Sequence, residues 1–169
     1  MPGPLRFDPI EEAGRQWREH WGPQTVAPMS AVTSIMRVQQ ILLARLNDLL
    51  EPYDLTFARY EALMLLFYSR RGQLPLGKIS DRLQVHRASV TNVIDKLCES
   101  GYVERAQHAQ DRRAVLARIT TEGKRVARRS TKVLNEAGFG TEPLTKAQSA
   151  ELTKLLTSVR VAAGDFAAE

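Results

Sequence analysis

The fold is decided by residues 74–105, LPLGKISDRLQVHRASVTNVIDKLCESGYVER. The opening letters predict a short helix over residues 76–83, because its isoleucine and last leucine lie one helical turn apart. The letters QVH interrupt that pattern, and a second helix is predicted over residues 87–100. It should end at Gly101, since glycine is typical of the position just past a helix C-terminus. The stretch therefore predicts two helices joined by a tight turn.

The second predicted helix has two different faces. Val90, Ile94 and Leu97 fall on one apolar face. The other face carries polar residues that can contact nucleic acid: Arg87, Ser89, Thr91, Asn92 and Lys96. This is the helix-turn-helix pattern, in which the second helix enters the major groove of DNA, where arginine suits guanine or phosphate and asparagine suits adenine. An ordinary solvated helix face is the alternative interpretation.

A β-hairpin is predicted directly after these helices. Alternating apolar and polar residues indicate strands over residues 102–106 and 114–120, joined by QHAQDRR. This joining segment contains Asp111, Arg112 and Arg113, and neighbouring arginines repel each other without contributing to a core. A hairpin beside a recognition helix lies near the minor groove, where arginine is favoured, and Asp111 would hold an arginine side chain in place by an ion pair. A turn with solvated charges is the alternative.

Helical patterns also precede the motif. Residues 30–50 show a broad apolar face, and the helix should end before Pro52. Thr56 is a suitable N-cap for a following helix that stops at Gly72. Because this second helix is apolar nearly all round, it should lie in the centre of the fold.

Two further helices follow the hairpin. The first is predicted over residues 122–137, after a cap at Thr120 or Thr121, and the second over residues 146–163, after a threonine and glutamine that fit a capping box. These helices and the one over residues 30–50 carry more apolar surface than a small winged module can cover. They are expected to pack together and against a second copy of the chain, with a core of their own as the alternative.

The composition is that of a soluble globular protein, with 43% apolar and 25% charged residues out of 169. A cytoplasmic location is expected, because no apolar run approaches the ~20 residues of a membrane span and the first residues lack the apolar core of a secretory signal. The net charge is +5, and residues 70–132 hold 15 Lys and Arg against 6 Asp and Glu. Such a stretch suits a polyanion, with a solvated basic surface as an equal alternative on charge alone.

Together these motifs resemble the MarR family of bacterial winged helix-turn-helix transcriptional regulators. The shared features are a short helix ending in leucine, VTNVIDKL in the recognition helix, a glycine and an aromatic residue followed by VER, a hairpin bearing Asp-x-Arg, and Thr-x-Glu-Gly before the next helix. The resemblance covers residues 30–163. It implies a mainly α fold with a small β-hairpin wing and a helical dimerisation region formed by helices from both chain ends.

The resemblance also implies residue roles, partners and a division of the chain. Arg113 matches the wing arginine that enters the minor groove, and Asp111 matches its anchoring acid. The family implies a homodimer that binds a pseudo-palindromic operator, usually as a repressor relieved by a small-molecule effector. The implied domains are an N-terminal arm (1–29), a dimerisation helix (30–54), a winged helix-turn-helix DNA-binding domain (55–120) and C-terminal dimerisation helices (121–169).

The N-terminal arm is similar to that of a subgroup with an extra N-terminal helix, some of whose members respond to urate. The letters IEEAGRQWREHW predict such a helix, with a frayed terminus as the alternative. Val93 stands where the subgroup has an arginine and Glu61 where it has an aspartate, so an anionic ligand lacks its obvious partner and urate is not assigned. Trp17, Trp21 and Glu61 are weak candidates for an effector pocket, and core packing is the stronger interpretation for the tryptophans.

Other functional classes have less support in the sequence. It shows no Gly-rich phosphate loop, nucleophile elbow or paired-carboxylate setting that would indicate an enzyme. His20, His86 and His108 lack metal-ligand spacing, so no metal or cofactor is assigned. Cys98 is interpreted as a small apolar residue rather than a redox sensor. We predict a sequence-specific DNA-binding regulator, with a non-specific architectural DNA-binding protein as the alternative.

Overall fold

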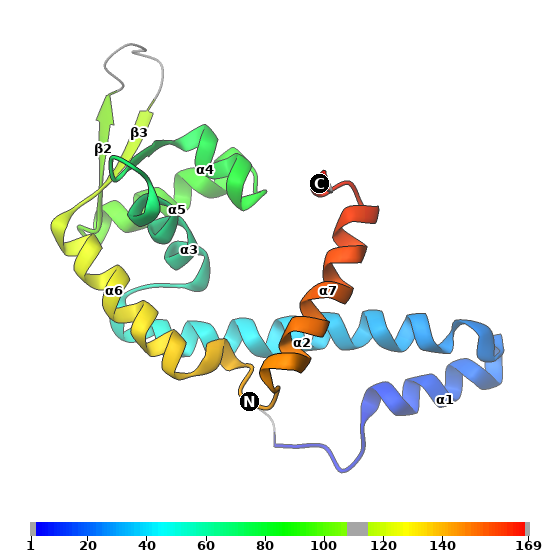
Figure 1. Ribbon diagram of the computed structural model, residues 1–169. Coiled ribbons are helices and arrows are strands. Elements are labelled where there is room, and N and C mark those ends of the chain that lie inside the picture. The colour runs from blue at the N-terminus through cyan, green and yellow to red at the C-terminus, as the bar shows by residue number, and fades with distance from the viewer. Residues whose placement is uncertain (1–2, 108–114, 168–169) are drawn as a thin grey trace. The chain divides into compact units, whose positions relative to one another are not determined.

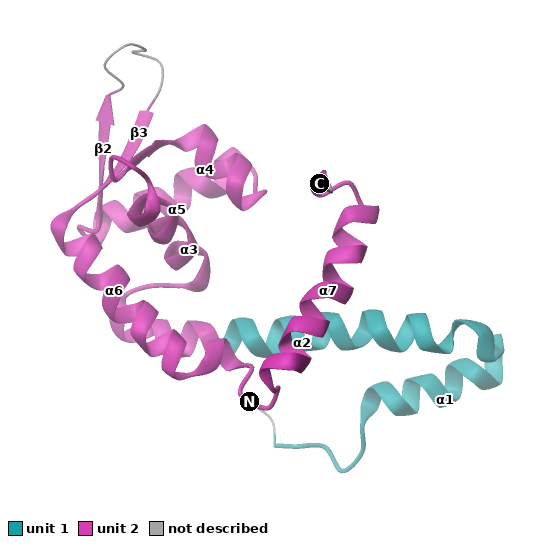
Figure 2. Cartoon of the chain, in the orientation of Figure 1, with its two compact units in different colours: residues 1–45 teal, residues 46–169 magenta. Residues whose placement is uncertain are grey.

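The computed structural model describes residues 3–107 and 115–167. The chain forms two compact units, Met1–Arg45 and Leu46–Glu169, which Figure 2 colours separately and which are described one at a time. Figure 1 labels the principal helices and strands in chain order. The fold is mainly helical with one small antiparallel sheet, which confirms the predicted fold class.

The N-terminal unit contains α1, Pro9–Trp21, which is the helix predicted in the arm. Asp8 caps it, because its carboxylate accepts a hydrogen bond from the backbone N–H of Ile10 at 2.8 Å. Gly14 is buried, and a Cβ at this position would lie 3.4 Å from Ser30 Oγ. The small residue thus lets α1 approach the beginning of the next long helix closely.

That next helix is α2, Val26–Leu50, which begins four residues earlier than predicted. The helix includes Pro28 in its first turn, where a proline loses no intrahelical hydrogen bond. Large apolar side chains along the part of α2 in the N-terminal unit are exposed: Val32, Ile35, Met36, Val38, Ile41 and Leu43. Its last residues, Leu46 and Leu50, are buried in the core of the second unit.

The core of the second unit surrounds α3, Phe57–Tyr68, as predicted for a central helix. Thr56 caps it by accepting a hydrogen bond from the N–H of Arg59 at 3.3 Å. The helix ends at Tyr68 rather than at Gly72, because Ser69 already has an extended backbone (φ −70°, ψ 142°). Five of its residues are buried: Tyr60, Ala62, Leu63, Met64 and Leu66.

A three-stranded antiparallel sheet packs beside these helices in the order β1-β3-β2. The predicted hairpin is confirmed as β2, Val103–Gln107, and β3, Val115–Ile119. The sequence analysis missed β1, Gln73–Pro75, which pairs with β3 and consists of only three residues. Arg118 on β3 spans all three strands, since its guanidinium donates to Gln73 at 3.0 Å and to Glu104 at 3.3 Å.

Two helices follow the sheet. Thr120 caps α6, Thr121–Glu136, by accepting from the N–H of Gly123 at 2.9 Å, and the buried face of this helix includes Val126 and Leu134. The predicted capping box begins α7, Lys146–Ala162. No residue of α7 is buried, and Leu152, Leu155 and Val159 are exposed. Within the described part of the chain, no helix combines the length and apolar character needed to cross a membrane.

Candidate nucleic-acid interface

The predicted helix-turn-helix is formed by α4, Leu76–Leu83, and α5, Arg87–Glu99. The turn between them is tight because Gln84 adopts the left-handed conformation (φ 53°) that ends α4. The Ser80 hydroxyl then donates to the carbonyl oxygen of Val85 at 2.6 Å, which fixes the turn from the side of the first helix. Helix α5 therefore leaves the turn in a defined direction (Figure 1).

Helix α5 separates its apolar and polar residues as predicted. Val90, Ile94 and Leu97 are at most 1% exposed and belong to the core cluster. The predicted contact residues are all exposed on this helix: Arg87, Ser89, Thr91, Asn92 and Lys96. Burial of three large side chains fixes the helix on the unit, so its polar side chains are displayed on a rigid support.

The exposed residues differ in whether their side chains already form hydrogen bonds or ion pairs within the chain. The Thr91 hydroxyl donates to the carbonyl oxygen of Arg87 at 3.1 Å, and Lys96 forms an ion pair with Glu99 at 2.7 Å. Within the described residues, no hydrogen bond or ion pair engages the side chains of Arg87 and Asn92. These two side chains can form bidentate contacts with base edges without first breaking a bond inside the chain.

A contact that the sequence analysis missed joins α5 to strand β2. The Nε and Nη2 atoms of Arg105 both donate to Asp95 Oδ1, at 3.1 and 2.6 Å. The two residues are ten positions apart and on different elements, so no helical or strand periodicity reveals the pair. This ion pair adds a side-chain connection between α5 and β2 to the short segment of backbone that joins them.

The C-terminal end of α5 is fixed by a second set of contacts. The Ser100 hydroxyl donates to the carboxylate of Asp54, and the Tyr102 hydroxyl donates to the carbonyl oxygen of Tyr53 at 3.0 Å. Tyr53 ends a short 3₁₀ helix, Glu51–Tyr53, that directly follows α2. The recognition helix is thus held at its end as well as along its apolar face.

The predicted wing residues Asp111, Arg112 and Arg113 lie outside the described residues, as does His108. The paired strands β2 and β3 lead into the segment that contains them, with Gln107 opposite Val115 in the register. The assignment of Arg113 to the minor groove and of Asp111 to its support therefore remains a prediction from the sequence.

The weak candidates for an effector pocket belong to different units. Trp17 donates through Nε1 to the hydroxyl of Thr25 at 2.9 Å, and its ring centroid lies 6.3 Å from that of Trp21, which is 73% exposed. Glu61 is an exposed residue of α3 in the second unit. Their assignment to an effector pocket remains a prediction.

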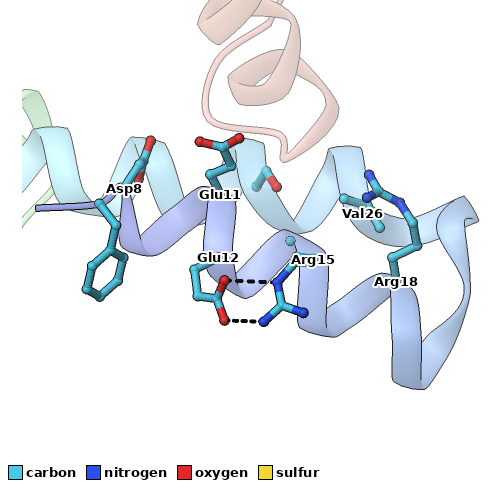
Figure 3. A pocket seen from close by; sticks show the side chains of 9 residues that line it. Asp8, Glu11, Glu12, Arg15, Arg18 and Val26 are labelled. Atoms are coloured by element: carbon cyan, nitrogen blue, oxygen red, sulfur yellow. Dashed lines mark hydrogen bonds and ion pairs between the residues drawn. The ribbon is translucent and has the colours of Figure 1, made fainter.

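The N-terminal unit has a hollow of about 540 Å³ beside α1, shown in Figure 3. Its lining is rich in charged side chains and does not include the two tryptophans. Glu12 and Arg15 face each other there in an ion pair of 2.7 Å, and the hydrogen bond from Arg15 lowers the pKa of Glu12 to about 2. These charges neutralise each other, so the hollow offers no uncompensated charge from this pair to a ligand.

Cys98 is half-buried against the core, and burial raises the pKa of its thiol. A raised thiol pKa decreases the thiolate fraction at neutral pH, which disfavours a redox role. Among residues 3–107 and 115–167, no group of three or more His, Cys, Asp or Glu side chains is placed to hold a metal ion.

The chain is similar to known transcriptional regulators. A model of the MarR family matches residues 55–115. The chain is 32% identical over 84 residues to the HTH-type transcriptional repressor YetL of Bacillus subtilis. The aligned part covers 47% of this chain and 50% of the length of that relative.

Two solved structures extend this similarity to most of the chain. Sco5413, a MarR family transcriptional regulator from Streptomyces coelicolor, matches with a TM-score of 0.78 and 45% identity, over 85% of this chain and 99% of that chain. A cysteine-to-serine variant of MarR from Escherichia coli, solved in complex with operator DNA, matches with a TM-score of 0.69 and 25% identity, over 85% and 96% of the two chains.

Proposed function

This chain belongs to the MarR family of winged helix-turn-helix transcriptional regulators, and on that basis we propose that it binds operator DNA in the cytoplasm and regulates transcription. The observation that carries the proposal is the recognition helix α5, which buries three apolar residues and exposes Arg87 and Asn92 without described partners. The operator complex of the Escherichia coli relative supports this use of the fold. Repression is the proposed output, because the relative YetL is a repressor.

We further propose that the protein acts as a homodimer on a pseudo-palindromic operator. Helix α2 and helix α7 each expose several large apolar side chains, which supports this, because large exposed apolar surface is commonly covered by a partner. Two symmetric recognition helices on one face of B-DNA require half-sites about 10 base pairs apart. The dimer thus determines the spacing of the sequences that are read.

The experiment that tests this function is the selection of bound duplexes from a random pool. The selected sequences should contain two inverted half-sites with a spacing of about one helical turn. Sedimentation should show a dimer that Leu155→Asp weakens and the neighbouring Lys154→Asp leaves intact. The proposal would be contradicted if the protein sedimented as a monomer and the selection enriched no particular sequence.

A non-specific architectural protein is the alternative that the same experiment addresses. Salt dependence alone does not separate the two, because both contact phosphates. A specific regulator binds its operator typically 10³-fold or more tightly than random duplex. A ratio near one would favour the architectural function.

We also propose control by a small-molecule effector. A hollow of about 330 Å³ between α3 and α6 supports this, since it is lined by the aromatic rings of Phe67 and Tyr68 and by the guanidinium of Arg128, which lies 5.5 Å from the centroid of the Phe67 ring. Lys132 in the same hollow forms an ion pair with Glu136 at 3.8 Å, so Arg128 is the cation that would receive an acidic ligand. This combination suits a small aromatic acid. Benzoate should weaken operator binding of the wild-type protein and have a smaller effect on Arg128→Gln. An equal response of both proteins would exclude this hollow as the effector site.

A further inference from the structure

A second group of basic residues lies on the winged unit, away from the residues that the sequence analysis selected. A hollow of about 520 Å³ is lined by Arg70 and Arg71, which lie in the turn after α3, and by Lys78 and Arg82 on α4. No carboxylate is among the described residues that line this hollow. We call this hollow, with its four cations Arg70, Arg71, Lys78 and Arg82, the basic hollow.

The positive charge of the basic hollow is not neutralised within the described chain. The four cations have no hydrogen bond or ion pair with any other described residue. Asp81, the acidic residue of α4, lines a different hollow at the start of α5. Four cations around one depression repel each other, and a bound polyanion would relieve that repulsion.

The position of the basic hollow on the helix-turn-helix indicates which polyanion it fits. Ile79 and Ser80 face the core, whereas Lys78 and Arg82 lie one turn apart on the outer part of α4. In helix-turn-helix complexes the first helix crosses the DNA backbone while the second enters the groove. We propose that the basic hollow binds phosphates of the operator backbone beside the groove read by α5, an inference that rests on the proposed function.

Contacts of this kind increase affinity without reading sequence. Phosphate contacts position a protein on the duplex, and each one releases condensed counterions when it forms. The basic hollow therefore contributes to how tightly the operator is held and to how strongly salt weakens the complex. The choice between sequences stays with α5 and the wing.

The test replaces the four cations together with glutamine and measures binding to the selected operator over a range of salt concentrations. The variant carries Arg70→Gln, Arg71→Gln, Lys78→Gln and Arg82→Gln. Each lost phosphate contact should reduce the slope of log K against log salt by ~0.9, so we expect a reduction of about 2 or more for a dimer. Affinity at low salt should fall at least about tenfold, whereas the ratio of operator to random-duplex affinity should stay within about twofold.

Two further variants serve as controls. The first removes four exposed cations elsewhere: Arg18→Gln, Arg37→Gln, Lys146→Gln and Lys154→Gln. It should keep the wild-type slope, because net charge alone does not supply a contact. The second carries Arg70→Lys, Arg71→Lys and Arg82→Lys and should retain most of the affinity, since a phosphate accepts hydrogen bonds from either cation.

The possible failures are distinguishable. A wild-type protein without sequence preference contradicts the proposed function itself, whereas a sequence-specific wild type with an unchanged slope in the glutamine variant overturns only the role of the basic hollow. Stabilisation by pyrophosphate that is lost in the variant, with an unchanged slope on DNA, would overturn it in favour of a small-anion site. If the fourfold variant does not fold, the Arg70/Arg71 and Lys78/Arg82 pairs are tested separately.

Discussion

Arg105, on the strand that enters the wing, donates two hydrogen bonds to a single carboxylate oxygen of Asp95 on the recognition helix. The pair connects the two elements that a winged helix-turn-helix presents to DNA. A change in the angle between them would break at least one of these hydrogen bonds. The pair therefore contributes to the orientation of strand β2 relative to α5 in the folded unit.

Removal of this pair should affect stability only slightly. The side chains of Arg105 and Asp95 are 36% and 49% exposed, and ion pairs at such positions contribute ~0.2–1 kcal/mol. A double-mutant cycle with Arg105→Gln and Asp95→Asn, measured by urea unfolding, should give a coupling free energy in that range that declines in 0.5 M salt. A coupling above about 2 kcal/mol would show that solvent does not screen the pair.

Asn92 should matter for binding and not for folding. Its exposed amide is suited to a bidentate contact with adenine, so Asn92→Ala should weaken operator binding by ~1–3 kcal/mol with the urea midpoint unchanged. Leu97→Ala on the same helix is the matched control. Because Leu97 is fully buried, this change should lower the free energy of unfolding by ~2–5 kcal/mol.

The roles of Arg113 and Asp111, which are predicted from the sequence, can be tested by substitution. Arg113→Ala should weaken operator binding by ~1–3 kcal/mol, because a minor-groove cation is lost while folding is retained. Asp111→Ala should also weaken binding, although it removes a negative charge, since the arginine loses its support. Titrations with labelled operator measure both effects. Tighter binding by Asp111→Ala would show that the carboxylate only repels DNA.

Gly123 at the beginning of α6 should not tolerate even a methyl group. A Cβ at this position would lie 2.1 Å from the carbonyl oxygen of Tyr102, which is a backbone atom that cannot turn aside. Gly123→Ala should therefore lower the free energy of unfolding by at least ~1–3 kcal/mol. At Gly77 in α4 a Cβ meets nothing within 4 Å, so Gly77→Ala should be neutral or stabilise by up to ~1 kcal/mol.

The sequence predicted the helices and the hairpin well because their signals are local. Helix caps such as Thr56, Thr120 and Thr145 act within three residues of their own position, and the spacing of Val90, Ile94 and Leu97 defines the buried face of α5 directly. The exposed polar residues of α5 follow from the same periodicity. Local residue spacing was thus sufficient to predict the helices, the hairpin and the exposed polar face of α5.

The missed features depend on contacts between distant segments. Strand β1 has only three residues and exists because Gln73 and Leu74 pair with β3. Gln73 lies opposite Arg118, which is 45 residues further along the chain. The Arg105–Asp95 pair and the basic hollow likewise combine side chains from separate elements. No spacing rule within one helix or strand encodes such neighbours, so only the three-dimensional structure reveals them.

The two hydrogen bonds at the end of α5 also have a mechanical consequence. Tyr53 and Asp54 stand immediately beyond the last turn of α2, and they hold Tyr102 and Ser100 at the other end of those bonds. A displacement of that turn must either drag the base of α5 along or break both links. Leu46 and Leu50 of that turn are buried in the same core as Ile94 and Leu97 of α5, so the two hydrogen bonds act together with the core packing to couple the ends of the two helices.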